Sequence, residues 1–318
     1  MKIAFFETGK EEKEYFSKNL KGHKLVFFKD FITPELADEV KDIYALCIFI
    51  YSKINTEILK KFSNLKYIAT RSTGYDHIDL EACKKAGIIL SNLPSYSQYS
   101  VAEHTFALLL ALARNLFDTK KMKRSIDVHK LNIFTLNGKN LGVIGTGRIG
   151  AQVIRIAKGF GMNIIAYDII QNDNLSKELN FSYVSLSELL EKSDIITLHV
   201  NLTNETEHLI NEDAFNKMKK GSVLINTSRG KVVDTEALIK SLESGIVSAA
   251  GLDVIEGEET WKLGQKSDFI KKLIRKGHVI LTPHIAYYSR ESFQKTLEDT
   301  LSNIKLFIEG KPQNIVNK

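Results

Sequence analysis

Three residues in the C-terminal half of the chain have side chains suited to binding and protonating a small acid. Arg229 occurs in "NTSRGK", Glu258 in "GLDVIEGEE" and His284 in "LTPHIAYYS", and each follows a short apolar run. A guanidinium can bind a carboxylate through two parallel hydrogen bonds. An imidazole can transfer a proton near neutral pH, and a carboxylate hydrogen-bonded to it fixes its tautomer. Together these residue types predict acid–base chemistry on a carboxylate-bearing substrate.

Each of these residues, taken alone, also has a simpler interpretation. Arg229 could be a surface residue, Glu258 could be a solvated loop acid, and His284 could be packed in the core. His284 is distinguished by its place at the end of a predicted strand, beside two tyrosines. The choice between the interpretations therefore depends on the elements around these residues.

A glycine-rich turn is the strongest local signal. In "LGVIGTGRIGAQVIRIAKGFGMNIIAYD", Gly145, Gly147 and Gly150 form the pattern GxGxxG between a predicted strand and a predicted helix. The first glycine allows the tight turn, the second lets the backbone approach a pyrophosphate, and the third lets helix pack on strand. The helix N-terminus offers unpaired N–H groups to the anion. The pattern predicts a dinucleotide site, whereas the simpler interpretation is a structural turn.

An acidic residue at the end of the next strand indicates which dinucleotide binds. Asp168 lies near the spacing of roughly 20 residues expected after the first glycine. Its carboxylate can accept hydrogen bonds from the ribose hydroxyls and repels a 2′-phosphate. Ile169 and Ile170 follow, with no arginine to hold such a phosphate. The sequence therefore predicts NAD in preference to NADP.

Short apolar runs alternate with helical segments nearly from end to end. Strands are predicted at 2–7, 24–28, 45–51, 65–71 and 87–92, and again at 140–144, 163–167, 182–185, 195–199, 222–226, 247–252 and 278–281. Such alternation is typical of parallel sheets covered by helices on both faces. Ligands of these sheets gather at the carboxyl ends of the strands. Arg229, Glu258 and His284 are all predicted to lie at such ends.

The strand pattern is interrupted once, which predicts two domains. A long helix is expected from 99 to about 122, and a last helix at about 290–309. The fold predicted is α/β, with two doubly wound parallel-sheet domains. A Rossmann NAD-binding domain, residues 99–286, is inserted in a flavodoxin-like substrate domain of residues 1–98 and 287–318. The active site is expected in the cleft between them.

Composition excludes several classes of protein. Cys47 and Cys83 form no CxxC and cannot make a disulfide framework, so no thiol-bound metal is predicted. The longest apolar runs are far shorter than the roughly 18 residues that span a bilayer. The net charge is +6, but the basic cluster "KKMKR" (120–124) lacks interleaved aromatics, so a solvated helix end is favoured over a nucleic-acid site. We expect a cytoplasmic protein without a metal, membrane or nucleic-acid partner.

Several segments together resemble the NAD-dependent D-isomer-specific 2-hydroxyacid dehydrogenases. In the family's order, between residues 71 and 289, they are "RSTGYDHIDLEAC", "NLPSYSQYSVAEHTFALLLALAR", "LGVIGTGRIG", "DIITLHVNLTNETEHLI", "GSVLINTSRGKVVDTEALIKSLESGIVSAAGLDVIEGEE" and "LTPHIA". The first 65 residues share the strand–helix rhythm only. The resemblance implies that the chain interconverts a small 2-oxo acid and its D-2-hydroxy acid with NAD. It also implies a homodimer, with the helix from 99 in the contact.

The resemblance assigns a role to each member of the trio. Arg229 would bind the carboxylate of the 2-oxo acid, His284 would protonate the ketone oxygen, and Glu258 would keep His284 protonated until then. Further substrate contacts are implied for Thr73, Gly74, Tyr96 and Tyr287. A cofactor site is implied for Gly145, Gly147, Arg148, Ile149, Gly150, Asp168, Val200, Asn201, Thr206, Thr227, Ser228 and Asp253, the last on the carboxamide.

Departures from the family pattern concern the substrate. Asn201 and Glu259 stand where the family often has proline, which leaves open the course of the loop that carries Glu258. Tyr287 and Tyr288 replace frequent small residues and, with Tyr96 and the stretch around Trp261, resemble the D-lactate dehydrogenase branch. That branch encloses a small substrate such as pyruvate, which is the first expectation here. The alternatives are a glyoxylate or hydroxypyruvate reductase, and a non-catalytic NAD(H)-sensing protein similar to corepressors of this scaffold.

Overall fold

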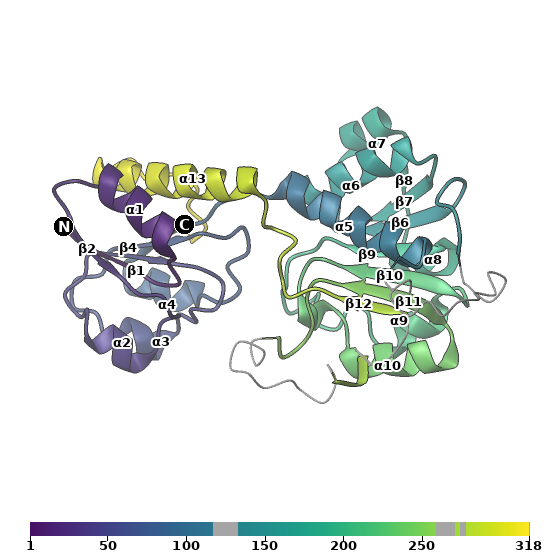
Figure 1. Cartoon of the computed structure of the whole chain (residues 1–318), viewed down its shortest axis with the longest axis horizontal. Helices are drawn as coiled ribbons and strands as arrows, with labels where there is room; N and C mark the ends of the chain where they lie inside the picture. The colour runs from purple at the N-terminus through teal and green to yellow at the C-terminus, as the bar shows by residue number, and fades with distance from the viewer. Residues whose placement is uncertain (117–132, 259–270, 274–277, 318) are drawn as a thin grey trace, which may run out of the picture. The chain divides into compact units, whose positions relative to one another are not determined.

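The computed structural model describes residues 1–116, 133–258, 271–273 and 278–317. By their contacts the residues form two compact units. Unit one comprises Met1–Tyr96 and Ser289–Lys318, and unit two comprises Ser97–Tyr288. The domain limits predicted from the sequence lie two residues away from both divisions. Each unit is built on one parallel sheet (Figure 1).

Among its described residues, unit one contains a five-stranded sheet in the order β2-β1-β3-β4-β5. Its strands are β1 (Lys2–Phe5), β2 (Lys24–Phe27), β3 (Ala45–Ile48), β4 (Tyr67–Thr70) and β5 (Ile89–Ser91). All neighbouring strands are parallel, in the order of a flavodoxin-like sheet. β3 and β4 are buried along their whole length, because helices cover both faces of the sheet.

The helices of unit one divide between the two faces of its sheet. On one face lie α2 (Pro34–Asp38), α3 (Thr56–Leu59) and α4 (Leu80–Lys85), and on the other lie α1 (Lys10–Asn19) and α13 (Arg290–Ile308) (Figure 1). α4 begins after the N-cap Asp79, whose side chain accepts a hydrogen bond from the Ala82 N–H. α13 returns from the end of the chain and buries Leu297, Leu301 and Ile304 against this sheet.

Unit two contains, within the described ranges, a seven-stranded parallel sheet in the order β12-β11-β10-β9-β6-β7-β8. Its strands are β6 (Asn140–Ile144), β7 (Asn163–Tyr167), β8 (Ser182–Tyr183), β9 (Ile195–Leu198), β10 (Ser222–Asn226), β11 (Val247–Leu252) and β12 (Val279–Leu281). From β6 the strand order runs through β7 to β8 on one side. The chain then returns, and β9 pairs with the other side of β6. This reversal of strand order is the place where Rossmann sheets bind dinucleotides, and the predicted α/β fold class is confirmed.

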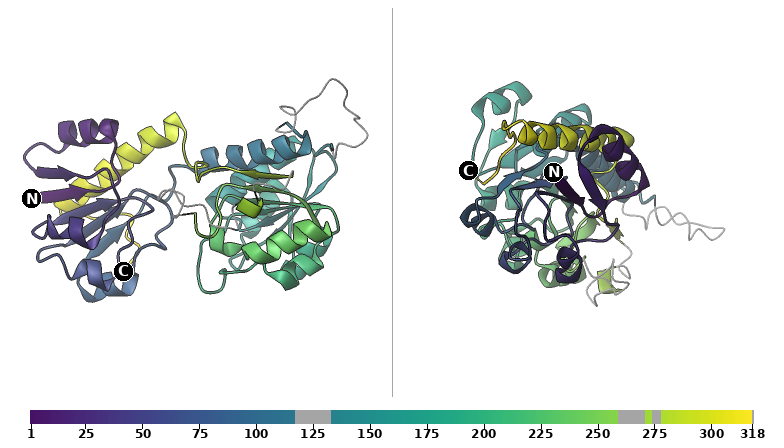
Figure 2. Two further views of the ribbon diagram at one scale, coloured as in Figure 1. Left: turned by 60° about the horizontal axis from the view of Figure 1, so that its bottom comes forward. Right: turned by 90° about the vertical axis from the view of Figure 1, so that its left-hand side faces the viewer.

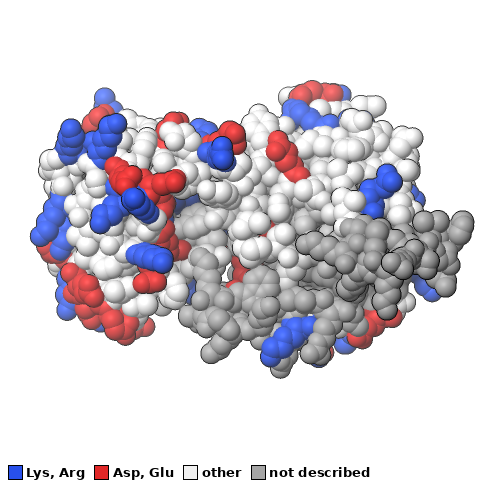
Figure 3. All heavy atoms as spheres, viewed as in Figure 1, with Lys and Arg blue, Asp and Glu red and all other residues white. Residues whose placement is uncertain are grey.

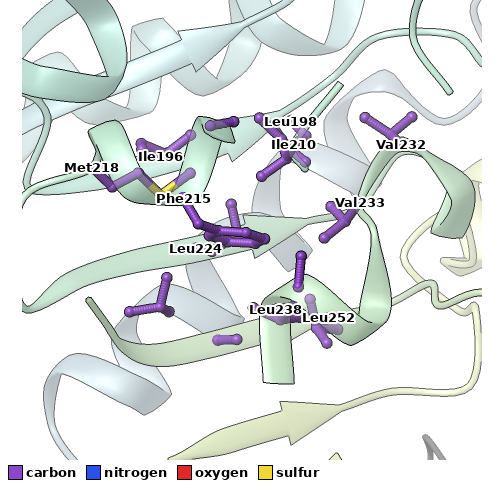
Figure 4. Packing of buried hydrophobic residues seen from close by; sticks show 14 of the residues in the cluster. Ile196, Leu198, Ile210, Phe215, Met218, Leu224, Val232, Val233, Leu238 and Leu252 are labelled. Atoms are coloured by element: carbon purple, nitrogen blue, oxygen red, sulfur yellow. The ribbon is translucent and has the colours of Figure 1, made fainter. Parts of the chain in front are cut away.

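Two layers of helices cover the sheet of unit two. Among the described residues these layers include α5 (Gln98–Ala113), α6 (Arg148–Gly159), α7 (Asp173–Leu179), α8 (Leu186–Lys192), α9 (Glu212–Lys217) and α10 (Thr235–Ser244), with the 3-10 turn η3 (Gly230–Val232). α5 and α6 pack on one face, and α8, α9 and α10 pack on the other (Figure 2). Figure 4 shows the second layer closely, with Phe215 of α9 and Leu238 of α10 near Leu224 of β10.

α5 ends earlier than the sequence predicts. The apolar pattern predicts a helix to about residue 122, but the helix stops at Ala113. Asn115 takes the left-handed conformation, with φ of 52°, and its N–H donates to the Leu112 carbonyl. Such a residue commonly ends a helix, because it satisfies a terminal carbonyl while turning the chain away. The basic cluster at 120–124 lies outside the described residues.

Charges of both signs are intermixed on the surface. On the face shown in Figure 3, Lys and Arg side chains lie among Asp and Glu side chains. Several are paired, as in Lys61–Asp38 at 3.0 Å and Arg155–Glu178 at 2.8 Å. On this face the described residues form no contiguous basic surface. In the described part of the chain, no helix is long and apolar enough to cross a membrane.

Candidate functional site

The predicted trio follows three neighbouring strands of unit two. β10 pairs with β11 and β11 pairs with β12, all in parallel. Arg229 follows β10, Glu258 lies in the loop after β11, and His284 follows β12. The loops are joined beyond the strands, because the Asp253 N–H donates to the Asn226 carbonyl and the His284 N–H donates to the Asp253 carbonyl, both at 2.9 Å. The structure therefore brings the three residues to one edge of one sheet.

Glu258 and His284 form a hydrogen-bonded pair. Nδ1 of His284 lies 2.6 Å from Oε1 of Glu258, and the two side chains are 15% and 19% exposed. The other carboxylate oxygen accepts a hydrogen bond from the Ile255 N–H at 3.1 Å, which fixes the Glu258 side chain to its own loop. Because Nδ1 faces the carboxylate, Nε2 is the ring nitrogen that can exchange a proton with a ligand.

The backbone at His284 is strained and is held from inside. Its φ is 53°, a left-handed value that is uncommon for a non-glycine residue. The Asp253 carboxylate, on a residue 1% exposed, accepts hydrogen bonds from the Ile285 and Ala286 N–H groups at 2.9 and 2.8 Å. The His284 N–H donates to the carbonyl of the same aspartate. Strained residues persist where their surroundings over-determine them, and they cluster at functional sites.

The segment that carries Arg229 is fixed by its own neighbours. The Asn226 amide donates to the Arg229 carbonyl at 2.9 Å, while the Asn226 side-chain oxygen accepts hydrogen bonds from the N–H and hydroxyl of Ser228. Gly230 approaches the next loop so closely that a Cβ there would lie 2.2 Å from the backbone carbon of Ile255. This contact places the backbone beside Arg229 directly against the turn that leads to Glu258.

The glycine loop has the form that a pyrophosphate requires. Gly145 has φ of 93°, and a Cβ on Gly150 would lie 2.0 Å from the Gly145 carbonyl oxygen. A Cβ on Gly147 would meet nothing within 4 Å among the described residues, so this side of the loop is open. No side chain within the described ranges caps α6, so its first N–H groups can face an anion. The residues present therefore fit a dinucleotide phosphate.

Asp168 lies against this loop. Its Oδ2 accepts hydrogen bonds from the N–H and the hydroxyl of Thr146, at 2.6 and 3.1 Å, and its Oδ1 accepts one from the Ile170 N–H at 3.0 Å. The hydroxyls of Thr146 and Tyr183 lie 2.8 Å apart. The following Ile169 and Ile170 are 85% and 78% exposed. Asp168 therefore lies at the carboxyl end of β7, and its contact with a ribose stays a prediction.

The other predicted cofactor residues lie along the same edge. Arg148 is exposed at the start of α6, whereas the Ile149 side chain packs on the core, so its N–H would be the group facing a phosphate. Val200 lies beside Gly145, with its Cγ1 3.0 Å from the position of a Cβ there. The Thr206 hydroxyl donates to the Asn201 carbonyl at 2.6 Å. Thr227 and Ser228 follow β10 and are each 8% exposed.

The predicted substrate residues are divided between the units. Thr73, Gly74 and Tyr96 belong to unit one. There the Thr73 hydroxyl donates to the Leu93 carbonyl, and Tyr96 is 9% exposed. Tyr287 belongs to unit two, and its ring meets the His284 ring edge-on with 6.1 Å between centroids. Glu259 and Trp261 lie outside the described residues.

A second histidine–carboxylate pair was not anticipated from the sequence. Nε2 of His208 lies 2.8 Å from Oε1 of Glu256, and the other oxygen of Glu256 accepts the Thr235 N–H at the start of α10. The hydrogen bond to Glu256 raises the pKa of His208, with smaller contributions from the charges of Glu256, Asp234 and Glu207. Glu256 precedes Glu258 by two residues. A histidine in the polar segment "NETEHLI" carries no local signal of such a partner.

Comparisons with known proteins agree with this geometry. Residues 106–286 match the family model described as "D-isomer specific 2-hydroxyacid dehydrogenase, NAD binding domain", which confirms the prediction of NAD as the cofactor. The chain is 38% identical to a glyoxylate reductase of Korarchaeum cryptofilum over 100% of this chain and 97% of the relative. It is 34% identical to a D-lactate dehydrogenase of Escherichia coli, with 98% of both chains covered. A crystal structure of D-lactate dehydrogenase from Aquifex aeolicus, complexed with NAD and lactic acid, superposes with a TM-score of 0.93 at 40% identity over 99% of both chains.

Proposed function

The chain belongs to the D-isomer-specific 2-hydroxyacid dehydrogenases, and within that family we propose that it interconverts pyruvate and D-lactate. The family membership confirms the prediction of an NAD-dependent oxidoreductase. The choice of substrate is the proposal, and it rests on one observation above others. The Glu258–His284 pair stands on the same sheet edge as Arg229, with Tyr287 edge-on to the imidazole. Relatives and a solved structure named D-lactate dehydrogenase support the same choice.

The proposed roles follow from what each group can do. Arg229 binds the carboxylate of the 2-oxo acid with its planar fork. NADH, which the glycine loop and Asp168 would hold, would supply a hydride to C2 of that acid when bound. Nε2 of His284 gives its proton to the ketone oxygen, which completes the hydroxyl group, and Glu258 stabilises the imidazolium before the transfer. A positioned proton donor of this kind contributes roughly 10²–10⁴-fold to the rate. The N–H groups at Thr73 and Gly74 are proposed as further carboxylate donors.

Aromatic side chains are proposed to limit the size of the substrate. The Tyr287 ring lies edge-on to the catalytic imidazole, with 6.1 Å between ring centroids. The Tyr288 ring lies edge-on to the Tyr287 ring, with 6.3 Å between centroids. A bulky wall beside the proton donor favours a methyl group over a larger side chain. Tyr96, which the family resemblance places among the substrate residues, is proposed as a further substrate contact.

Glyoxylate or hydroxypyruvate is the second candidate substrate. It is favoured by the glyoxylate reductases among the relatives, one of them 38% identical over the full chain. The non-catalytic NAD(H)-sensing alternative predicts cofactor binding without turnover. The hydrogen-bonded Glu258–His284 pair argues against it, since a protein that only senses the cofactor has no use for a proton donor.

A substrate panel tests the proposal. NADH oxidation is followed with pyruvate, 2-oxobutyrate, 2-oxoisocaproate, hydroxypyruvate and glyoxylate, and the product of pyruvate is assigned on a chiral column. We expect the highest kcat/KM with pyruvate and a D product. A higher value with glyoxylate or hydroxypyruvate would transfer the assignment to the second candidate. NADH binding without oxidation on any acid would contradict both.

A cytoplasmic homodimer is part of the same proposal. The two cysteines are free and buried, which fits a reducing compartment. The dimer is proposed by analogy with the family alone. Sedimentation velocity of the purified chain measures the mass directly, and a monomer across the accessible concentration range would contradict this part.

A further inference from the structure

The loop that carries His284 depends on one buried carboxylate. Asp253 holds the N–H groups of Ile285 and Ala286 with its two oxygens and the N–H of His284 with its carbonyl. Consecutive N–H groups turned toward an anion form a nest, which stabilises a left-handed residue such as His284. Whatever fixes the Asp253 carboxylate therefore also fixes the backbone of the proton donor.

The Thr282 hydroxyl also contacts the Asp253 carboxylate. This contact determines which partner is the donor in each of the two hydrogen bonds of Thr282. The Thr282 hydroxyl lies 2.5 Å from Oδ1 of Asp253, and a carboxylate can only accept, so the hydroxyl donates. A hydroxyl has one proton. In its second contact, with Nε2 of His104 at 3.0 Å, the Thr282 oxygen must therefore accept. It follows that Nε2 of His104 carries a proton and donates it.

His104 belongs to α5, and the same helix supports the loop at a second point. The Ser100 hydroxyl donates to the Ala286 carbonyl at 2.8 Å. Ser100 and His104 are four residues apart and therefore lie on one face of the helix. The two contacts reach both ends of the segment 282–286. Nε2 of His104 also lies 3.5 Å from Oδ1 of Asp253, which adds attraction when the ring is protonated.

We propose that His104 is a positioning residue for the proton donor: its Nε2–H, through Thr282 and Asp253, holds the strained loop that aims His284. The proposal rests on the function proposed above for His284. If residue 104 cannot donate, the Thr282 oxygen no longer accepts a hydrogen bond from it. The hydroxyl that donates to the Asp253 carboxylate is then no longer fixed in position. A misplacement of about 1 Å at a reacting group can cost on the order of 10²-fold in rate, so a small shift of the loop has a measurable effect.

Three variants separate hydrogen bonding from packing. His104→Met removes the donor and keeps most of the volume, His104→Gln keeps an N–H donor at a similar reach, and His278→Met makes the same change at an exposed histidine of unit two. We expect His104→Met to lower kcat about tenfold, with His104→Gln and His278→Met within about threefold of the parent. In His104→Met the Kd of NADH should change less than kcat does, because the glycine loop and Asp168 are not involved.

Two kinetic outcomes with the His104 variants would overturn the proposal. Unchanged kcat in His104→Met would show that the donor is not needed. An equal loss in His104→Met and His104→Gln would show that the ring acts by packing. If His104→Met does not fold, Thr282→Val and Thr282→Ser make the same comparison from the other partner, and equal kcat values in that pair would overturn the proposal as well.

A measurement without substrate distinguishes this proposal from the proposed function. Hydrogen exchange of the NADH-bound protein reports the Ile285 and Ala286 amides, which should exchange faster in His104→Met than in the parent and remain protected in His104→Gln. This result is expected even if no acid of the panel is reduced, in which case the proposed function fails alone. Unaltered protection of these amides in His104→Met would refute the positioning role, whatever the activity.

Discussion

The carboxyl edge of the unit-two sheet has two halves that are built differently. In the cofactor half, β6 to β8, the glycine loop and Asp168 lie within one strand–helix–strand stretch, and Asp168 accepts a hydrogen bond from the Thr146 N–H of that loop. In the catalytic half, β10 to β12, Arg229, Glu258 and His284 come from three loops separated by whole crossovers. The first half depends on local backbone chemistry. The second half depends on strand register and on contacts between loops.

The two halves also differ in how they hold unusual backbone. At the carboxyl end of β6 the left-handed residue is a glycine, Gly145, for which that conformation has little cost. In the catalytic half it is His284, whose conformation is maintained by Asp253. Changes in the cofactor half should therefore alter affinity for the cofactor, whereas changes in the catalytic half should alter turnover or the stability of the loops.

Removal of the proton donor should give the largest effect. We expect His284→Ala to lower kcat by roughly 10²–10⁴-fold, while the Kd of NADH is unchanged. His284→Asn tests the same step with a residue that tolerates the left-handed backbone. A loss of kcat in this variant therefore reflects the missing proton donor and not backbone strain. Steady-state kinetics and NADH fluorescence measure both quantities. Near-parental turnover in either variant would remove His284 from the mechanism.

Gly230 and Gly147 give a matched pair across the two halves. Gly230→Ala places a Cβ against the Ile255 backbone and should cost about 1–3 kcal/mol of stability, with a loss of kcat through the Glu258 turn. Gly147→Ala meets no described atom within 4 Å and should leave the thermal midpoint unchanged while it weakens NADH binding. Calorimetry measures the thermal midpoint of each variant without NADH and its increase when NADH is added. Equal destabilisation in both variants would contradict the inference that Gly230 is closely packed and Gly147 is not.

The charge of Asp168 should control the preference between NAD and NADP. Asp168→Asn keeps an acceptor for the Thr146 N–H but removes the charge that repels a 2′-phosphate. We expect the ratio of kcat/KM values for NADH over NADPH to fall about tenfold, which corresponds to about 1.4 kcal/mol. Asp173→Asn, an exposed acid at the start of α7, is the control. An unchanged ratio would mean that Asp168 serves only to hold Thr146.

The His208–Glu256 pair should produce the smallest effect, and it depends on pH. Because the pKa of His208 is raised in the folded protein, its contribution is present below the unfolded pKa of about 6.5 and is lost as pH rises through the folded value. The side chain is 43% exposed, so the contribution is of the order of 0.2–1 kcal/mol.

We therefore expect His208→Gln to lower the thermal midpoint slightly near pH 6 and to have less effect near pH 9. Calorimetry at both pH values, with His278→Gln as the control, measures the difference. A loss of stability that is the same at both pH values would indicate packing instead of charge.

The elements of the cofactor half could be predicted almost completely. The strands at 140–144 and 163–167, the glycine loop and Asp168 all follow from signals within a short window of sequence, and the structure places them as predicted. The end of α5 could not be predicted in this way, because the apolar pattern continues beyond Ala113 while Asn115 turns the chain. The pairing of His208 with Glu256 had no local signal either.

The amino-acid sequence by itself determined the two parallel sheets, the dinucleotide loop and the types of residue that act on the substrate. These follow from hydrophobic periodicity, glycine spacing and side-chain chemistry, which are local properties. Only the tertiary structure decided that Glu258 faces Nδ1 of His284, that the Asp253 carboxylate is enclosed by the His284 loop, and that His104 reaches this loop from α5. These contacts join residues far apart in the chain. Their geometry depends on strand register and helix packing, which no short stretch of sequence specifies.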